Sequence, residues 1–261
     1  MDSWLLAALA VPLGVALGLA LGWLAWGRGR YSVDGAAERT SRAWRRSLDA
    51  VLAGETPAAI EELTRLLQSQ PDTVETYLGL GTLFRVAGDP HRAARIHKTV
   101  TVREALGEPM RREARLAVGL DLQAGGHRDE AIANLEALVS NASDLAPAWR
   151  ALAELYEADG RHAKAYEALA RHGKLTGRTD TRNLARLKIA EGESLVAEGQ
   201  RSGARKAFAK AASIAPHDAR GHVALARYHL NDGARAKAAN ASLAAVEAEP
   251  DGAAIAWRAL V

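Results

Sequence analysis

One glycine–alanine pattern recurs six times between residues 54 and 238. In each copy an alanine follows a glycine by five residues, and successive alanines lie 34, 38, 34, 39 and 34 residues apart. The six pairs are Gly54/Ala59, Gly88/Ala93, Gly126/Ala131, Gly160/Ala165, Gly199/Ala204 and Gly233/Ala238. A near-constant period of this length indicates a repeat architecture, in which each copy folds into one small unit and packs on its neighbours.

The residue types in this pattern suit two antiparallel helices joined by a tight turn. Glycine tolerates the positive φ that ends the first helix, and alanine lets two helices cross closely. Each copy also has a small residue ahead of the turn, where the first helix would meet the second. These residues are Ser47, Gly81, Gly119, Ala153, Gly192 and Ala226. A 34-residue period with these features is typical of the tetratricopeptide repeat. The sequence therefore predicts an all-α fold, a superhelical solenoid of about six helical hairpins over residues 41–250.

Prolines and the two longer spacings mark the ends of repeats. Pro71, Pro216 and Pro250 stand where three copies should end, because proline interrupts a continuing helix. The spacings of 38 and 39 residues indicate insertions at about residues 104–112 and 174–183. We expect these insertions either to bend the stack or to lengthen a helix end. The last segment, residues 251–261, is predicted to form a partial terminal helix.

An uncharged apolar run precedes the repeats. It extends for 23 residues from Trp4 to Trp26, and as a helix it would cover the roughly 30 Å of a bilayer's hydrocarbon core. The alternative is a cleaved secretory signal, but the run is longer than a usual signal core and no positive charge precedes it. We therefore predict a transmembrane anchor at residues 1–27, followed by a basic juxtamembrane linker at residues 28–40. The arginines after the run favour an outside N-terminus and a cytoplasmic body.

Three glycines within the predicted span lie four residues apart, at Gly14, Gly18 and Gly22. This spacing places them on one helix face, where small residues allow two transmembrane helices to approach closely. We expect this face to contact another transmembrane helix, either that of a partner or that of a second copy, which would make the protein a homo-oligomer. Glycine is also common in membrane spans without such a role.

The charge is uneven along the chain. The net charge is +3, and residues 28–47 alone carry an excess of four positive charges. Asp2 contributes one negative charge, so residues 48–261 sum to zero. A neutral body does not predict a nucleic-acid interface, which needs clustered positive charge. The chain has no cysteine, which excludes disulfides and thiol nucleophiles. It also lacks GxSxG and HExxH motifs, and its histidines are scattered, so no catalytic residue, metal site or cofactor is predicted.

Stacked hairpins of this type leave a concave face lined by the first helix of each pair. We expect this groove to bind an extended or helical peptide, partly through acidic groups on the peptide. The groove residues are those that lie one helix face away from the packing positions. The alternative is an ordinary solvated face. The predicted groove residues are Arg85, Gln123, Arg150, Glu154, Glu157, Arg186, Arg220 and Arg227.

The layout of one N-terminal span, a basic stretch and tetratricopeptide repeats resembles the lipopolysaccharide assembly protein B family of Gram-negative bacteria. The most specific local similarity is TVETYLGLGTLFRVAGDPHRAARIHKTV at residues 73–100, followed by LDLQAGGHRDEA around Gly126. Within residues 73–100, the positions that resemble the family and are not among the predicted groove residues are Arg92, Arg95 and His97. The resemblance implies an adaptor that engages a membrane-bound ATP-dependent protease and the protease's deacetylase substrate. That family also has a C-terminal rubredoxin-like zinc module built on two CxxC pairs, which a chain without cysteine lacks.

The sequence thus predicts a non-catalytic, single-pass scaffold that binds protein partners at the cytoplasmic face of the bacterial inner membrane, in envelope or lipopolysaccharide biogenesis. The alternative is a periplasm-facing assembly factor, of the type used in cytochrome c maturation or outer-membrane assembly. That alternative requires the opposite topology.

Overall fold

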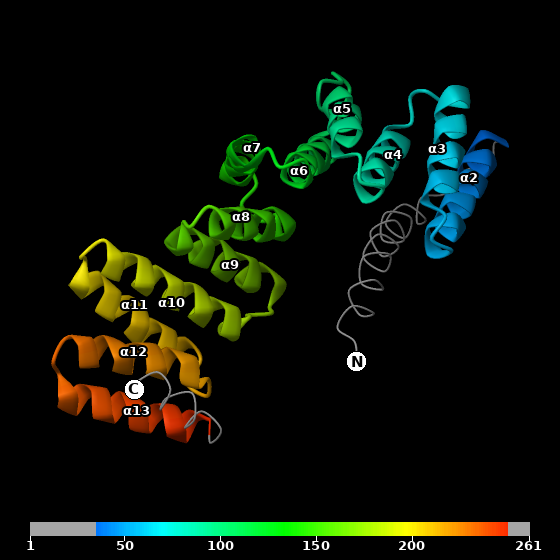
Figure 1. The fold of residues 1–261 in the computed structure, drawn as a ribbon. Helices are drawn as coiled ribbons and strands as arrows, with labels where there is room; N and C mark the ends of the chain where they lie inside the picture. The colour runs from blue at the N-terminus through cyan, green and yellow to red at the C-terminus, as the bar shows by residue number, and fades with distance from the viewer. Residues whose placement is uncertain (1–34, 250–261) are drawn as a thin grey trace. The chain divides into compact units, whose positions relative to one another are not determined.

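The computed structural model describes residues 35–249, which form twelve α-helices and no strand. The helices follow one another along the chain as consecutive antiparallel pairs (Figure 1). Their bounds are α2 Gly35–Leu52, α3 Thr56–Ser69, α4 Val74–Val86, α5 Pro90–Thr101, α6 Glu108–Ala124, α7 Arg128–Asn141, α8 Ala146–Ala158, α9 His162–Thr176, α10 Thr181–Ala197, α11 Arg201–Ile214, α12 Ala219–Asn231 and α13 Arg235–Ala248. The predicted all-α fold is confirmed for these residues.

Each of the six predicted glycines lies in the turn between the two helices of a pair. All six have positive φ, between 71° and 85°. No non-glycine residue in the described part of the chain has a positive φ. Every residue there that adopts this conformation is therefore a glycine, which does so without steric strain. The six predicted hairpins are thereby confirmed, with their turns at the expected residues.

The small residues of the pattern lie where the paired helices cross. The six predicted alanines are at most 4% exposed. A Cβ added at Gly81 would lie 2.5 Å from His97 Nε2, and one added at Gly192 would lie 2.5 Å from Phe208 Cε1. A larger residue would therefore force the two helices of the pair apart.

The two insertions lengthen helices. The first helices α6 and α10 each have 17 residues, whereas α4, α8 and α12 each have 13. Four extra residues add about one helical turn. Of the two outcomes expected for the insertions, the structure thus shows a longer first helix in the third and fifth hairpins.

The helices divide into two compact units, one through Asn134 and the other from Leu135, with the division inside α7. In the first unit the core includes Leu63, Leu80 and Leu83. In the second unit alanines supply much of the core, as in the cluster of Ala185, Ala211 and Ala215. Small core residues bring the helix axes close together, so the second unit tolerates little added volume between its helices.

Some predicted elements lie outside the described residues. These are the transmembrane anchor with Gly14, Gly18 and Gly22, most of the linker, and the partial terminal helix at residues 251–261. The helix α2 begins at Gly35, so it overlaps the end of the predicted linker. Among residues 35–249, no helix is both long and apolar enough to span a bilayer.

Candidate functional site

The first helices of the second unit, α8, α10 and α12, carry six of the eight predicted groove residues. The other two, Arg85 on α4 and Gln123 on α6, belong to the first unit. Four of the six line one pocket of about 250 Å³ between α8 and α10, which we name the charged pocket. Its lining residues include Arg150, Glu154, Glu157, Leu169, His172, Arg178, Asp180, Asn183, Arg186 and Leu187.

A bidentate ion pair joins the two helices at the charged pocket. Arg186 donates from its two terminal nitrogens to the two carboxylate oxygens of Glu157, at 2.6 and 2.8 Å. The hydrogen bonds from Arg186 hold the pKa of Glu157 below its usual value. The pair stabilises the fold at pH values above the ordinary pKa of a glutamate. This stabilisation is lost as the pH falls through the lowered pKa of Glu157. The ion pair therefore links neighbouring hairpins at neutral pH.

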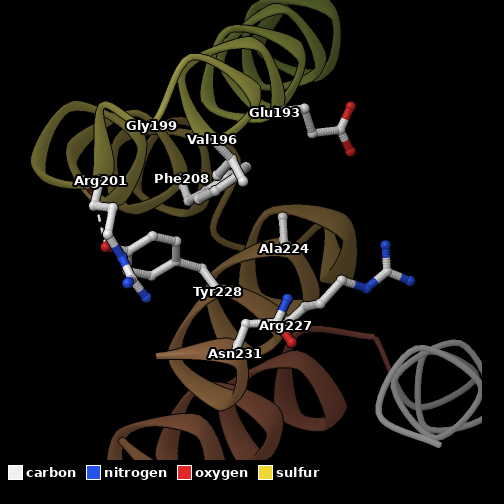
Figure 2. Close-up of a pocket in the computed structure, with 9 residues that line it drawn as sticks. All are labelled: Glu193, Val196, Gly199, Arg201, Phe208, Ala224, Arg227, Tyr228 and Asn231. Atoms are coloured by element: carbon white, nitrogen blue, oxygen red, sulfur yellow. Dashed lines mark hydrogen bonds between the residues drawn. The ribbon is translucent and has the colours of Figure 1, made fainter. Parts of the chain in front are cut away.

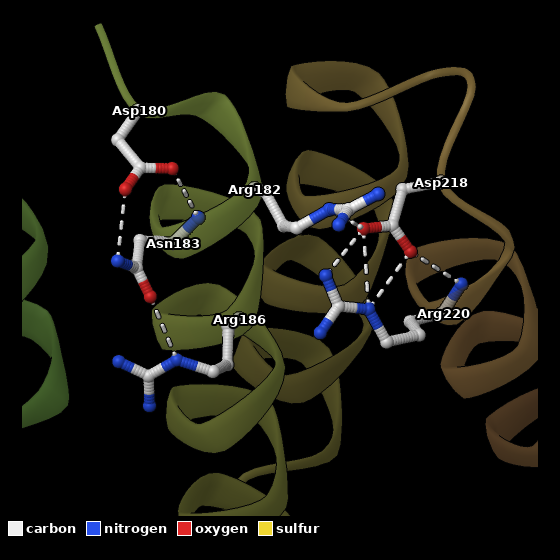
Figure 3. A network of polar contacts seen from close by, with 6 residues as sticks. All are labelled: Asp180, Arg182, Asn183, Arg186, Asp218 and Arg220. Atoms are coloured by element: carbon white, nitrogen blue, oxygen red, sulfur yellow. Dashed lines mark hydrogen bonds and ion pairs between the residues drawn. The ribbon is translucent and has the colours of Figure 1, made fainter. Parts of the chain in front are cut away.

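The start of α10 positions Arg186. Asp180 caps the helix by accepting a hydrogen bond from the backbone N–H of Asn183 at 3.0 Å, and its second oxygen accepts one from Asn183 Nδ2 at 2.9 Å. The Asn183 Oδ1 atom then accepts a hydrogen bond from Arg186 Nε at 3.0 Å (Figure 3). Because each group in this chain is held by the one before it, the guanidinium has a defined orientation.

A second carboxylate, Asp218, orients an arginine at the start of α12 in the same way. Asp218 accepts hydrogen bonds from Arg220 at 2.9 Å from Nε and 2.5 Å from a terminal nitrogen, and Arg182 of α10 lies 3.6 Å away (Figure 3). The hydrogen bonds from Arg220 hold the pKa of Asp218 below its usual value. Asp218 was not among the predicted groove residues.

Four of the five predicted groove arginines thus already have carboxylate partners within the chain. Besides the pairs of Arg186 and Arg220, Arg150 lies 3.1 Å from Glu154 on the same helix, and Arg85 lies 2.8 Å from Asp121. An acidic group on a bound peptide would have to compete with these internal partners. The recognition of acidic groups through these arginines stays a prediction.

A second pocket in the same unit has a more apolar lining, and we name it the aromatic pocket. It has a volume of about 530 Å³ and lies between α10, α11 and α12. Val196, Phe208, Ala224 and Tyr228 supply its apolar surface, with Arg227 and Glu193 at its edge (Figure 2). Its other lining residues are Gly199, Arg201 and Asn231. Arg227 is the one predicted groove residue that lines this pocket.

The aromatic side chains of this pocket are held in place. The rings of Phe208 and Tyr228 have centroids 5.9 Å apart, and the Tyr228 hydroxyl donates to the backbone carbonyl of Arg201 at 2.9 Å. Val196 nevertheless has 49% of its surface exposed. A preformed concave site with an apolar floor and a few polar groups at its edge is the usual form of a binding pocket. Aromatic residues make up only 5% of this chain, and that scarcity was the signal that could have drawn attention to Phe208 and Tyr228.

The family-like residues on α5 do not form one site. Arg92 lies over the ring of Phe84, 5.0 Å from its centroid, and pairs with Asp89 at 3.3 Å. Arg95 lines a separate pocket of about 390 Å³ in the first unit. His97 points into the interior and is fully buried.

His97 belongs to a buried charged cluster with Asp121 and Arg85. Its Nδ1 lies 2.5 Å from Asp121 Oδ2, its Nε2 lies 3.1 Å from the carbonyl oxygen of Leu78, and Arg85 donates to Asp121 Oδ1 at 2.8 Å. Each ring nitrogen therefore has an oxygen partner, one from a side chain and one from the backbone. Asp121, which sequence reasoning missed, lies between Arg85 and His97 and joins α4, α5 and α6.

The described residues include no group of three or more His, Cys, Asp or Glu side chains arranged to hold a metal ion. The buried polar cluster around Asp121 instead has its partners within the chain. It therefore supports packing of the first unit, while the two pockets of the second unit are open to a ligand.

Comparisons with known proteins agree with this architecture. A family model described as "Tetratricopeptide repeat" matches residues 45–97 and 116–174. Together with the six hairpins, this match decides the repeat type. The chain contains tetratricopeptide repeats.

Among curated proteins, the chain is similar to lipopolysaccharide assembly protein B of Escherichia coli strain K12. The identity is 29% over 171 residues, which cover 64% of this chain and 42% of that protein. The same protein of Escherichia coli O157:H7 gives the same figures. The chain thus spans less than half the length of the curated relatives it matches.

Among solved structures, a tetratricopeptide repeat protein from Parabacteroides merdae is 15% identical, with 78% of each chain covered and a TM-score of 0.51. The Pseudomonas aeruginosa pilF structure is 17% identical, covers 83% of this chain and 95% of its own, and has a TM-score of 0.49. The first of these similarities supports the fold.

Proposed function

We propose that this protein is a membrane-tethered scaffold whose second unit binds a protein segment in the aromatic pocket. The observation that carries the proposal is the apolar pocket of about 530 Å³ between α10, α11 and α12. Its size and lining suit a large apolar side chain of a bound segment. Arg227 and Glu193 at its edge supply polar contacts of both signs.

The charged pocket extends the same surface to α8. The ion pair between Glu157 of α8 and Arg186 of α10 is already formed in the free chain, so it holds these two helices at a fixed spacing before a partner arrives. A preorganised surface loses less conformational entropy on binding. We therefore assign the anchoring contact to the aromatic pocket and the shaping of the groove to the charged pocket.

The membrane tether is supported by the uncharged run from Trp4 to Trp26 and by the arginines that follow it. The similarity to lipopolysaccharide assembly protein B supports a role in envelope or lipopolysaccharide biogenesis at the bacterial inner membrane. The partners we propose are a membrane-bound ATP-dependent protease and its substrate, engaged without catalysis by this chain.

The pocket is tested by photo-crosslinking of the full chain in membranes. A photoreactive amino acid at Val196 should crosslink a defined partner, and the additional substitution Ala224→Trp should reduce that product at least tenfold, because the indole fills the pocket. Ala236→Trp, at an exposed position on α13 outside the pocket, is the matched control and should leave the product unchanged. Equal crosslinking in the two tryptophan variants would contradict the proposed site.

The tether and its orientation are tested by C-terminal reporter fusions. A cytoplasmic body predicts a fluorescent C-terminal green fluorescent protein fusion and an inactive alkaline phosphatase fusion. The opposite result would support the periplasm-facing assembly factor. Release of the chain from membranes by alkaline carbonate would overturn the tether itself.

A further inference from the structure

The positive charge of the second unit gathers on the second helices of its hairpins. α11 carries Arg201, Arg205, Lys206 and Lys210 and contains no carboxylate. α13 adds Arg235 and Lys237 against a single glutamate. The neutral total for residues 48–261 therefore conceals a separation of charge that is visible once the helices are assigned to hairpins.

Most of these cations have no carboxylate partner in the part of the chain that the structure describes. Within the described residues, Arg201 pairs with Asp232 at 2.7 Å, whereas Arg205, Lys206, Lys210 and Lys237 make no ion pair. All four are exposed. We name these four residues the basic face.

Two helices contribute to the basic face at one place. The pKa of the buried His229 on α12 is lowered first by burial, and then by Lys237 of α13 and Arg205 of α11, with Asp232 acting in the opposite direction. The helices α11 and α13 both pack against α12, so Arg205 and Lys237 act on the same ring from two sides of that contact. The positive field is not confined to a single helix.

The residues between the cations of α11 are small. Ser202, Ala209 and Ser213 are exposed on the same side of the helix as Lys206 and Lys210. Long cationic side chains over small neighbours can reach a flat surface without obstruction. The exposed side of α11 has no aromatic residue on which a base could stack, which disfavours a single-stranded nucleic acid.

We propose that the basic face contacts an anionic lipid surface. The inference rests on the proposed membrane tether, because a tethered body stays near the headgroups and weak contacts then suffice. Lysine and arginine side chains close to an anionic surface each contribute attraction that falls off within a Debye length, about 8 Å at physiological salt. Lys206 and Lys210 line neither pocket of this unit, so the contact leaves the aromatic pocket open to a partner.

The test uses the full chain reconstituted into vesicles of phosphatidylcholine alone or of phosphatidylcholine with about 30% phosphatidylglycerol. Lysine acylation rates are followed residue by residue with mass spectrometry. We expect labelling of Lys206 and Lys210 to slow at least fivefold on the anionic vesicles and to recover in 0.5 M NaCl, because salt screens the contact. Lys98, on the first unit, is the internal reference and should label equally on both vesicles.

Charge reversal provides the matched variants. The double variant Arg205→Glu/Lys237→Glu should restore the labelling of Lys206 and Lys210 to the rate on neutral vesicles. Arg115→Glu, at an exposed position on α6, should leave the protection in place. Equal labelling of the wild-type chain on the two vesicles would overturn the proposal, as would protection that a 12-nucleotide RNA produces and anionic vesicles do not.

These outcomes are separate from those of the proposed function. Alkaline carbonate extraction reports on the tether, and the Val196 crosslink reports on the aromatic pocket. Loss of lysine protection in the double variant with an unchanged crosslink is the result expected if the basic face orients the body without binding the partner.

Discussion

Asp121→Ala is expected to lower the free energy of unfolding by about 3 to 5 kcal/mol, the usual effect of removing one partner from a buried ion pair. Asp121 is 1% exposed and lies between the guanidinium of Arg85 and the ring of His97, which is itself fully buried. Without the carboxylate, the guanidinium of Arg85 would lose its counter-charge and Nδ1 of the buried His97 ring would lose its hydrogen-bond partner. The cost is large because water cannot reach the ring to replace the lost partner.

Denaturant unfolding of the full chain measures this effect, and hydrogen exchange of α4, α5 and α6 locates it. Glu104→Ala is the matched control, because Glu104 is an exposed carboxylate between α5 and α6. It should change the free energy of unfolding by less than about 0.5 kcal/mol, as surface substitutions usually do. A loss below about 1 kcal/mol for Asp121→Ala would show that the cluster does not hold the three helices together.

Gly221→Ala is expected to destabilise the second unit by about 1 to 3 kcal/mol through overpacking. A Cβ at this position would lie 2.7 Å from the backbone nitrogen and 2.8 Å from the Cα of Ala212. Backbone atoms of α11 cannot rotate away as the end of a side chain can, so α11 and α12 would have to separate. This strain exceeds the gain of about 1 kcal/mol that alanine normally brings to a helix interior.

Gly203→Ala makes the same chemical change on α11, but it should not destabilise the second unit. Its Cβ would meet the terminal methyl of Leu195 at 3.3 Å, and that side chain can turn aside. Thermal unfolding of the two variants should therefore move the melting temperature down for Gly221→Ala and leave it equal or higher for Gly203→Ala. A melting temperature that rises for both would mean that the α11–α12 spacing is looser than the structure shows.

The hairpins were predictable because their signals are local. A turn that needs positive φ requires glycine wherever it occurs, and a crossing between adjacent helices requires alanine five residues later. Gly88 and Ala93 illustrate the rule, with φ of 85° and complete burial. The insertions were also located from spacing, but the choice between bending the stack and adding a turn depended on packing.

The groove was predicted less well than the hairpins. Its residues were placed on the correct helices, yet the sequence did not show that Arg186 and Glu157 bond to each other across 29 residues. Of the missed partners, Asp121 lies 36 residues from Arg85 in the sequence, about one repeat, and Asp218 lies two residues from Arg220. Whether two such groups meet depends on how far each hairpin is rotated against the next, and no short motif records that rotation.

The sequence by itself determined the repeat, its turns, its small crossing residues and the charged segment beside the apolar run, because each depends on residues close together in the chain. The tertiary structure decided which charges are neutralised and which remain free. It also assembled the aromatic pocket from Val196, Phe208 and Tyr228 on three different helices. The physical reason is that pockets and ion pairs form between hairpins, where the geometry of stacking, and not the local pattern, sets the distances.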